Sequence, residues 1–430
     1  MIQYTTNVFE WNILVRKSDK MSCKNYDKKY ANLLVKKCFV NDGIRPLVIL
    51  YDDELEKFAQ TCYIQAKECG FKDVVLFNKK SREINEYLLN NSLDDIKIND
   101  LLDRSLLEDY AKKNSNFLFL ETYKKETNIN IDKEKKQKLN EIIDSQLDTY
   151  YENIDNLKCP WCVACYPNYD WAKKVYPNMN IEDAYERLYL NIMKMCQIDK
   201  RSPEKAWDEI HKRYYEISQR LNELEIKKLH YSNKLGTNLN IYLPDNHLWI
   251  GADDRDYYGN SIIVNMPGYE LFTSPLCSET NGIVYSSKPL YYKKVIDSFG
   301  LEFKNGSVSN IITSVKEDYD ILKSIIDRDD NSKYLGECAI VENDNPVNKT
   351  NTLYYELLYD ENASCHLALG NSYPDSIKNG LSMTEEELIS SGLNISNTHV
   401  DFMIGTDDLK IEAETKNGPK LIYSKGKFRI

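Results

Sequence analysis

Two histidines in the C-terminal half of the chain stand among carboxylates at spacings that could hold a metal ion. His399 and Asp401 are two residues apart in the segment THVDFMI, which alternates polar and apolar residues. On a strand, residues two apart project from the same face, so this imidazole and this carboxylate would point the same way. Together they would form half of a divalent-metal site. An aspartate that only hydrogen-bonds a histidine would give the same pattern.

The other histidine lies in DENASCHLALG, which spans Asp360 to Gly370. Glu361 and His366 lie close together there, beside apolar residues that could bury them. Ionised groups are costly to bury without a partner or a metal, so this segment is a second candidate half-site. A capped helix start or a loop is the alternative interpretation.

Two further glutamates interrupt apolar runs. Glu270 follows the turn-like NMPGY and precedes Leu271 and Phe272, and Glu337 lies within LGECAIV. Either glutamate alone would be interpreted as the solvent-facing residue of a strand. They are candidate metal ligands only if the fold brings them close to the two histidines.

Taken together, these segments resemble the aminopeptidase T/aminopeptidase S family of thermophile-type two-metal aminopeptidases. The stretches NMPGYELFTSP, LGECAIV, LLYDENASCHLALG with Tyr373 just beyond, and NTHVDFMIG occur in the family's order and at similar separations. Weaker matches, CVACYPNYDWA, GTNLNIYLP, HLWIG and KPL, extend the likeness through most of the chain. The resemblance implies a shared set of ligands for two divalent metal ions: Glu270, Glu337, Glu361, His366, His399 and Asp401.

The resemblance also implies a reaction, in which two ions activate a water that attacks the first peptide bond of a substrate with a free N-terminus. Glu337 is the candidate bridging ligand, and either Glu337 or Glu361 would carry the proton to the leaving amine. Tyr373 would stabilise the oxyanion. Zn, Co, Mn and Mg all accept such a mixed ligand set. The family further implies a homodimer, and Tyr269, which replaces a glutamate of the family pattern, is expected at the rim of the site.

Two functional alternatives stay open: a two-metal amidase or deacylase acting on a non-peptide amide, and a catalytically weak paralogue that only binds. A redox or iron–sulfur role for Cys159, Cys162 and Cys165 is a third reading of the sequence. If that segment is a strand, Cys162 points away from the other two, so buried thiols are the favoured interpretation. The motifs HExxH and GxSxG are absent from the sequence.

The elements that must position these residues divide the chain into two predicted domains, an α/β domain at 1–177 and an α+β domain at 178–430. Four apolar runs predict strands in the first domain, and a helical stripe from Asp52 to Gly70 follows the first strand, as in a doubly wound, mostly parallel sheet. Asp183–Tyr231 is predicted helical, and short strands follow from Leu235. The predicted strands of the first domain are Pro46–Tyr51, Asp73–Phe77, Asn116–Leu120 and Cys162–Tyr166.

The amino-acid composition argues against several other classes of protein function. The 430 residues are 42% apolar, which is enough for a substantial core, and the net charge of −11 argues against a nucleic-acid partner. No run reaches the roughly 18–20 apolar residues that would span a bilayer. Met1–Leu14 lacks the pattern of a leader peptide, and 11 cysteines, an odd number, favour free thiols. We therefore expect a cytoplasmic protein without a membrane segment. The lysine-rich stretch Tyr123–Asn140 is predicted to be a solvated helix face.

Overall fold

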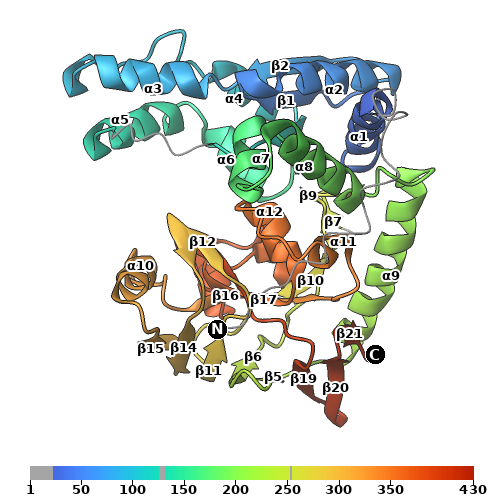
Figure 1. Ribbon diagram of the computed structural model, residues 1–430, viewed down its shortest axis with the longest axis vertical. Coiled ribbons are helices and arrows are strands. Elements are labelled where there is room, and N and C mark those ends of the chain that lie inside the picture. The colour runs from blue at the N-terminus through green and yellow to red at the C-terminus, as the bar shows by residue number, and fades with distance from the viewer. Residues whose placement is uncertain (1–22, 125–130, 252–253) are drawn as a thin grey trace.

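A computed structural model describes residues 23–124, 131–251 and 254–430 (Figure 1). The segment Met1–Leu14, from which the absence of a leader was predicted, lies outside the described residues, as do positions 125–130 of the predicted solvated helix. An α/β layer of N-terminal helices and strands lies across the top of Figure 1, and the C-terminal strands fill the lower part.

The upper layer is built on a parallel sheet whose strand order is β2-β1-β3-β4-β9. Its strands are β1 (Leu47–Tyr51), β2 (Val74–Asn78), β3 (Asn116–Glu121), β4 (Trp161–Cys165) and β9 (Asn265–Met266). Every pair is parallel. Buried parallel strands read as continuous apolar runs, which is why the four predicted strands were visible in the sequence.

Helices cover both faces of this sheet, so the predicted doubly wound α/β fold is confirmed. Leu47 and Ile49 pack into one core with helices α1, α2 and α8, whereas Val48 and Leu50 pack into another with α4 and α6. Helix α5 buries none of its residues, in agreement with a solvated helix. The helices are α1 (Cys23–Lys37), α2 (Glu56–Glu68), α3 (Ser81–Asn90), α4 (Ser105–Ala111), α5 (Lys133–Asp144), α6 (Asp148–Asp155), α7 (Tyr169–Val175) and α8 (Ile181–Met195).

Helix α9 (Pro203–Glu223) connects the two parts and runs down one side of the molecule in Figure 1. It begins where the Ser202 side chain caps it. The helical prediction for Asp183–Tyr231 was wrong at its end, because Lys228–Ser232 forms strand β5. Leu229 and Tyr231 alternate with polar residues there and are buried in a sheet core, which a strand achieves and a helix would not.

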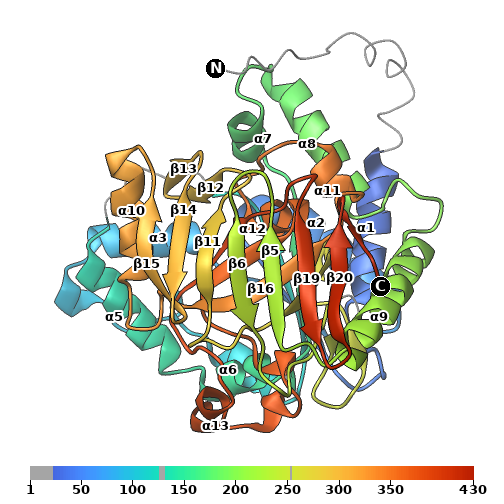
Figure 2. The same cartoon turned by 90° about the horizontal axis from the view of Figure 1, so that it is seen from below.

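The lower part contains two antiparallel sheets with a core between them. The smaller sheet has the order β10-β16-β17-β18, and the larger has the order β15-β14-β11-β6-β5-β19-β20-β21, which Figure 2 shows face on. The smaller sheet consists of β10 (Glu270–Thr273), β16 (Leu335–Val341), β17 (His366–Gly370) and β18 (His399–Met403). The larger consists of β15 (Ser307–Ile312), β14 (Gly300–Lys304), β11 (Asn281–Tyr285), β6 (Asn238–Tyr242), β5, β19 (Lys410–Thr415), β20 (Gly418–Ser424) and β21 (Lys427–Phe428).

Short elements complete this mixed region, and the α+β prediction is confirmed. They are β7 (Asp254–Arg255), β8 (Ser261–Ile262), β12 (Leu290–Tyr292), β13 (Lys294–Ile296), α10 (Lys316–Ile326), α11 (Pro346–Lys349), α12 (Leu357–Asp360) and α13 (Glu385–Ser390). The domain boundary at residues 177/178 stays a prediction; helix α8 and strand β9, from beyond it, lie with the first sheet. Among the described residues, no helix combines the length and apolarity that crossing a membrane requires.

Candidate metal centre

Because side chains alternate between the two faces of a strand, the candidate metal ligands of the smaller sheet lie on the face opposite the core. Val400 and Phe402 of β18 pack into the core between the two sheets, so His399 and Asp401 project from the opposite face. The sequence predicted this shared face. His366 projects from the same face of β17, because its neighbour Leu367 packs into the core. Three candidate ligands therefore come from two adjacent strands, which pair directly.

Glu337 reaches this face through an irregularity in β16. Simple alternation would put Glu337 on the side of Leu335, which is buried in the core together with Cys338. The pairing of β16 with β17 shifts register between Leu335 and Glu337, and the shift turns the Glu337 side chain to the site. Gly336 occupies the shift, where a Cβ atom would lie 2.0 Å from the carbonyl oxygen of Asn371, so only glycine fits.

Five of the six predicted ligands meet in two groups that share Glu337. His366 Nε2 lies 3.1 Å from Glu270 Oε2 and 3.5 Å from Glu337 Oε1. His399 Nε2 lies 3.4 Å from Glu337 Oε2 and 3.4 Å from Asp401 Oδ1. Within each group, the possible ligand atoms lie within 4.8 Å of one another. Glu337 thus presents one oxygen to each imidazole.

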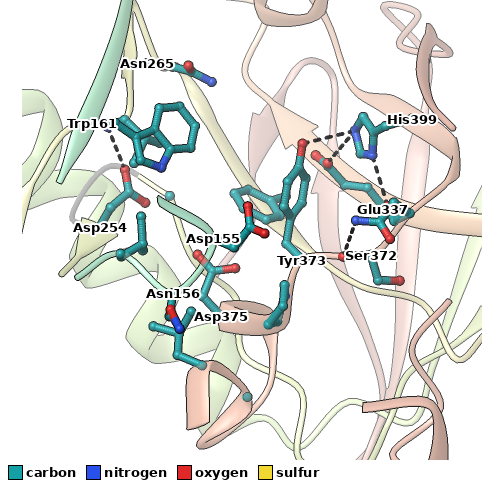
Figure 3. Close-up of a pocket in the computed structure, with 18 of the residues that line it drawn as sticks. Asp155, Asn156, Trp161, Asp254, Asn265, Glu337, Ser372, Tyr373, Asp375 and His399 are labelled. Carbon is teal, nitrogen blue, oxygen red and sulfur yellow. Dashed lines mark hydrogen bonds and ion pairs between the residues drawn. The ribbon is translucent and has the colours of Figure 1, made fainter. Parts of the chain in front are cut away.

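Backbone carbonyls fix the orientation of both imidazoles. His366 Nδ1 lies 3.2 Å from the carbonyl oxygen of Ser364. His399, labelled in Figure 3, has its Nδ1 3.0 Å from the carbonyl oxygen of Asn371. A carbonyl can only accept, so each Nδ1 donates and each Nε2 faces the carboxylates. Metal-binding histidines are commonly oriented in this way, by a hydrogen bond from the ring nitrogen that does not face the metal.

Glu361 and Tyr373 lie at the edge of these groups. Glu361 is buried at the start of the 3-10 turn η4 (Glu361–Ala363), but its carboxylate lies outside both groups. Burial, together with the charge of Glu270, raises the pKa of Glu361 well above its usual value. The Tyr373 hydroxyl lies 3.4 Å from His399 Nε2. Burial and the nearby carboxylates raise the pKa of Tyr373, so its hydroxyl remains a hydrogen-bond donor.

The donor set fits divalent cations. The face carries four carboxylates and two imidazoles, and no lysine or arginine of the described residues pairs with them. Glu270 Oε2 is buried, and its 3.1 Å contact with His366 Nε2 does not have hydrogen-bond geometry, so this oxygen accepts no hydrogen bond within the described structure. Buried carboxylates of this number need positive charge, and oxygen and imidazole nitrogen are ligands that divalent ions accept.

Electrostatics within the set support the central place of Glu337. Burial by itself would raise the pKa of Glu337, but hydrogen bonds from His366 and His399 outweigh it and hold that pKa at about 2. Burial raises the pKa of Glu270, which has only one imidazole beside it. Glu337 is therefore the carboxylate that the two imidazoles keep ionised.

Asn362, within the DENASCHLALG segment, is a positioning residue for which the sequence predicted no role. Its Oδ1 accepts the backbone N–H of Tyr269, and its Nδ2 donates to the Leu358 carbonyl at 2.9 Å. Because Asn362 and Tyr269 adjoin Glu361 and Glu270 in the chain, this buried amide ties together the segments that carry two predicted ligands. The only sequence signal was its position directly after Asp360 and Glu361.

Tyr269 does not lie at the rim of the site, so that expectation was wrong. Its side chain is buried, its hydroxyl donates to the Met195 carbonyl at 2.6 Å, and Gln197 Nε2 donates to the hydroxyl at 2.7 Å. Its ring packs on Trp207, with the centroids 5.1 Å apart. Tyr269 turns into the first core because Glu270, the next residue, turns to the site.

The three neighbouring cysteines are buried thiols, as favoured from the sequence. Cys159 lies in one core of the parallel sheet, and burial raises its pKa to about 12. Cys162 and Cys165 lie in the other core, where burial raises both pKa values well above the usual value. The expectation that Cys162 points away from both others was wrong for Cys165, because β4 ends there.

A cavity of about 510 Å³ opens onto the metal-centre residues between the upper layer and the smaller sheet (Figure 3). One wall comes from residues 154–157 and from Trp161, and the other comes from residues 371–375 and 380–395. A substrate in this cavity would contact both parts of the chain.

Residues 24–428 match the family described as Thermophilic metalloprotease (M29). The chain belongs to this family. It is 40% identical over 275 residues to aminopeptidase AmpS of Bacillus subtilis (strain 168), an alignment that spans 64% of this chain and 66% of that one. It is 36% identical over 315 residues to aminopeptidase 2 of Geobacillus stearothermophilus, spanning 73% and 76% of the two chains.

A solved structure with the same fold aligns with nearly the whole of this chain. The wild-type AmpT of Thermus thermophilus superposes with a TM-score of 0.81 at 23% identity, covering 95% of this chain and 100% of that one. The family resemblance inferred from the sequence is thus confirmed. Membership of a metalloprotease family makes this M29 protein a metal-dependent hydrolase of peptide bonds.

Proposed function

We propose that this M29 protein is an aminopeptidase that removes the N-terminal residues of peptides with two divalent ions. The observation that carries the proposal is the position of Glu337, whose two carboxylate oxygens face two different imidazoles. The relatives named aminopeptidase AmpS and aminopeptidase 2, together with an aminopeptidase T of Thermus aquaticus, support exopeptidase activity. They favour it over the alternatives of a two-metal amidase, a deacylase or a binding paralogue.

The six predicted residues would hold the ions. Glu270, Glu337 and His366 would hold one, Glu337, His399 and Asp401 the other, with Glu361 completing the set from η4. Zn, Co, Mn and Mg are the candidate metals. When bound, such a pair of ions would lower the pKa of a water molecule and polarise the scissile carbonyl.

The chain's own groups would handle protons and developing charge. The Tyr373 hydroxyl, kept protonated, would donate a hydrogen bond to the oxyanion. Glu361 suits the proton carrier better than Glu337, because the Glu361 carboxylate lies outside both ligand groups whereas the two Glu337 oxygens face the two imidazoles. A carboxylate that is not fully engaged by the ions can accept a proton and return it to the leaving amine.

Individual carboxylate oxygens at the edge of the metal centre would select the free N-terminus, since an ammonium group gains from a nearby carboxylate and an acetylated amine does not. Metal-stripped protein should therefore cleave aminoacyl-4-nitroanilides when Co or Zn is added back, and leave the N-acetylated counterparts intact. Equal cleavage of both sets would point to the amidase alternative, and cleavage of neither to the binding paralogue.

We further propose that the protein is a homodimer, as the family resemblance implies, and that it is cytoplasmic. Support for a reducing compartment comes from the ten cysteines with described side chains, which are all free thiols. Light scattering on purified protein would test the dimer. A monomer at every concentration with full activity would contradict it.

A further inference from the structure

The cavity has an outer compartment that the metal ions would not occupy. In Figure 3, Tyr373 stands between Glu337 and His399 on one side and Asp155 and Asp375 on the other. Asp375 belongs to the 3-10 turn η5 (Pro374–Ser376), and Asp155 ends helix α6 on the opposite wall. The compartment therefore lies beyond the phenol ring, where the side chain of a bound substrate would extend.

The turn that carries Asp375 is held rigidly. Ser376 Oγ donates to Ser274 Oγ at 2.7 Å, and Ser274 lies just beyond β10. The backbone N–H of Tyr373 also donates to Ser274 Oγ, at 3.3 Å. These bonds fix the turn to the smaller sheet, so Asp375 has a defined position relative to the metal-centre residues.

The two aspartates lack a positive partner. Neither Asp375 nor Asp155 forms an ion pair with any described residue, and none of the described residues that line the cavity is a lysine or an arginine. Burial raises the pKa of Asp375 to about 6, to which the charge of Glu337 adds. A cation arriving with the substrate would offset the cost of ionising Asp375 in the cavity.

The other walls suit the stem of a long cationic side chain. Leu157 and Trp161 line the cavity from the upper layer, and Leu381 and Met383 line it from the lower part. Aliphatic stems of lysine and arginine pack on such apolar surface, and a guanidinium stacks on an indole face. A purely apolar side chain would fill the same walls but would leave Asp375 unpaired.

We propose that this outer compartment binds a basic side chain of the substrate's N-terminal residue, with Asp375 as the principal counter-charge and Asp155 at the mouth. The inference rests on the proposed aminopeptidase function and makes N-terminal arginine and lysine the preferred substrates. An α-ammonium group is the weaker candidate for Asp375, since that group would lie with the scissile bond on the metal side of Tyr373.

The test compares kcat/KM for arginyl-, lysyl- and leucyl-4-nitroanilide in the metal-loaded protein and in two variants. Wild type should favour the basic substrates, and Asp375→Asn should lower the arginyl-to-leucyl ratio roughly tenfold to a hundredfold, the range expected for a charge-assisted hydrogen bond. Asp155→Asn should lower it less, because Asp155 is exposed. Glu386→Gln makes the same charge change on exposed α13, outside the cavity lining, and should leave the ratio as in wild type.

An unchanged ratio in Asp375→Asn, or an equal loss for arginyl and leucyl substrates, would overturn the inference and leave the proposed function intact. Absence of cleavage of every free-amine substrate by wild type would instead overturn the proposed function, and the inference with it.

Discussion

Gly336 is the residue at which one added methyl group should disable the metal centre. A Cβ atom there would lie 2.0 Å from the carbonyl oxygen of Asn371 and 2.3 Å from that of Gly370, and both contacts are to backbone. Ordinary van der Waals contact begins at 3.4 Å, so the segment around Gly336 and the segment at residues 370–371 must move apart by about 1.4 Å. Relief of such a clash in a packed region costs about 1–3 kcal/mol of stability.

The displacement falls on the groups that build the site. Glu337 is the next residue, and the Asn371 carbonyl accepts the hydrogen bond of His399 Nδ1 at 3.0 Å. Catalytic groups must be held within about 0.5 Å, and a misplacement of about 1 Å costs roughly a hundredfold in rate. Gly336→Ala should therefore lower kcat/KM for a leucyl-4-nitroanilide by roughly a hundredfold. Metal affinity should fall by about tenfold to a hundredfold, as when a metal-binding histidine loses the hydrogen bond that orients it.

The assay combines steady-state kinetics at saturating metal, calorimetric metal titration and thermal unfolding. Gly43→Ala is the control for a glycine-to-alanine change without a clash, because an added Cβ at Gly43 has nothing within 4 Å; unlike Gly336, Gly43 has a positive φ, of 74°, which strains an alanine there. The control should lose about 1 kcal/mol of stability from backbone strain and retain activity. If Gly336→Ala folds and keeps activity and metal affinity within twofold of wild type, the assigned role of the β16 irregularity is wrong.

Three further predictions follow from the same centre. Replacing His399 or Asp401 by alanine should abolish hydrolysis while leaving a folded dimer, measured by light scattering, because each change removes a ligand rather than core packing. Asn362→Ala leaves the Tyr269 N–H without its acceptor and should cost about 1–3 kcal/mol in denaturant unfolding, with a loss of activity that exceeds the loss of folded protein. In metal-free protein, burial opposes protonation of His366 and His399, but the surrounding carboxylates raise both pKa values well above 6.5. Stability from these groups is complete below the unfolded pKa of about 6.5 and is lost as pH rises through the higher folded pKa values. The Tm with chelator should therefore fall as the pH is raised above about 6.5, and bound metal should flatten this dependence.

The shared face of His399 and Asp401 followed from the sequence because strand periodicity is local. Alternation within THVDFMI was enough to place His399 and Asp401 on one face, and the burial of Val400 and Phe402 agrees. The strands of the parallel sheet could also be predicted from the sequence, since they are continuous apolar runs. These features depend on neighbouring residues alone.

The remaining features depend on contacts between distant segments. The register shift that turns Glu337 to the site exists only in the pairing of β16 with β17. Tyr269 contacts Met195 and Trp207, which lie more than 60 residues away in the sequence, so its orientation could not be predicted from its own segment. Asp375 was missed because its cavity forms between η5 and the end of α6, which are far apart in the sequence.

The central claim, that Glu337 is shared by two metal ions, is tested most directly by the metal content of Glu337→Gln. Wild type and the Glu386→Gln control should each bind two divalent ions per chain in calorimetric titration and in elemental analysis after dialysis. Glu337→Gln, verified as folded by circular dichroism, should lose both ions at the same free metal concentration. One ion per wild-type chain, or two ions retained by Glu337→Gln, would contradict the shared site.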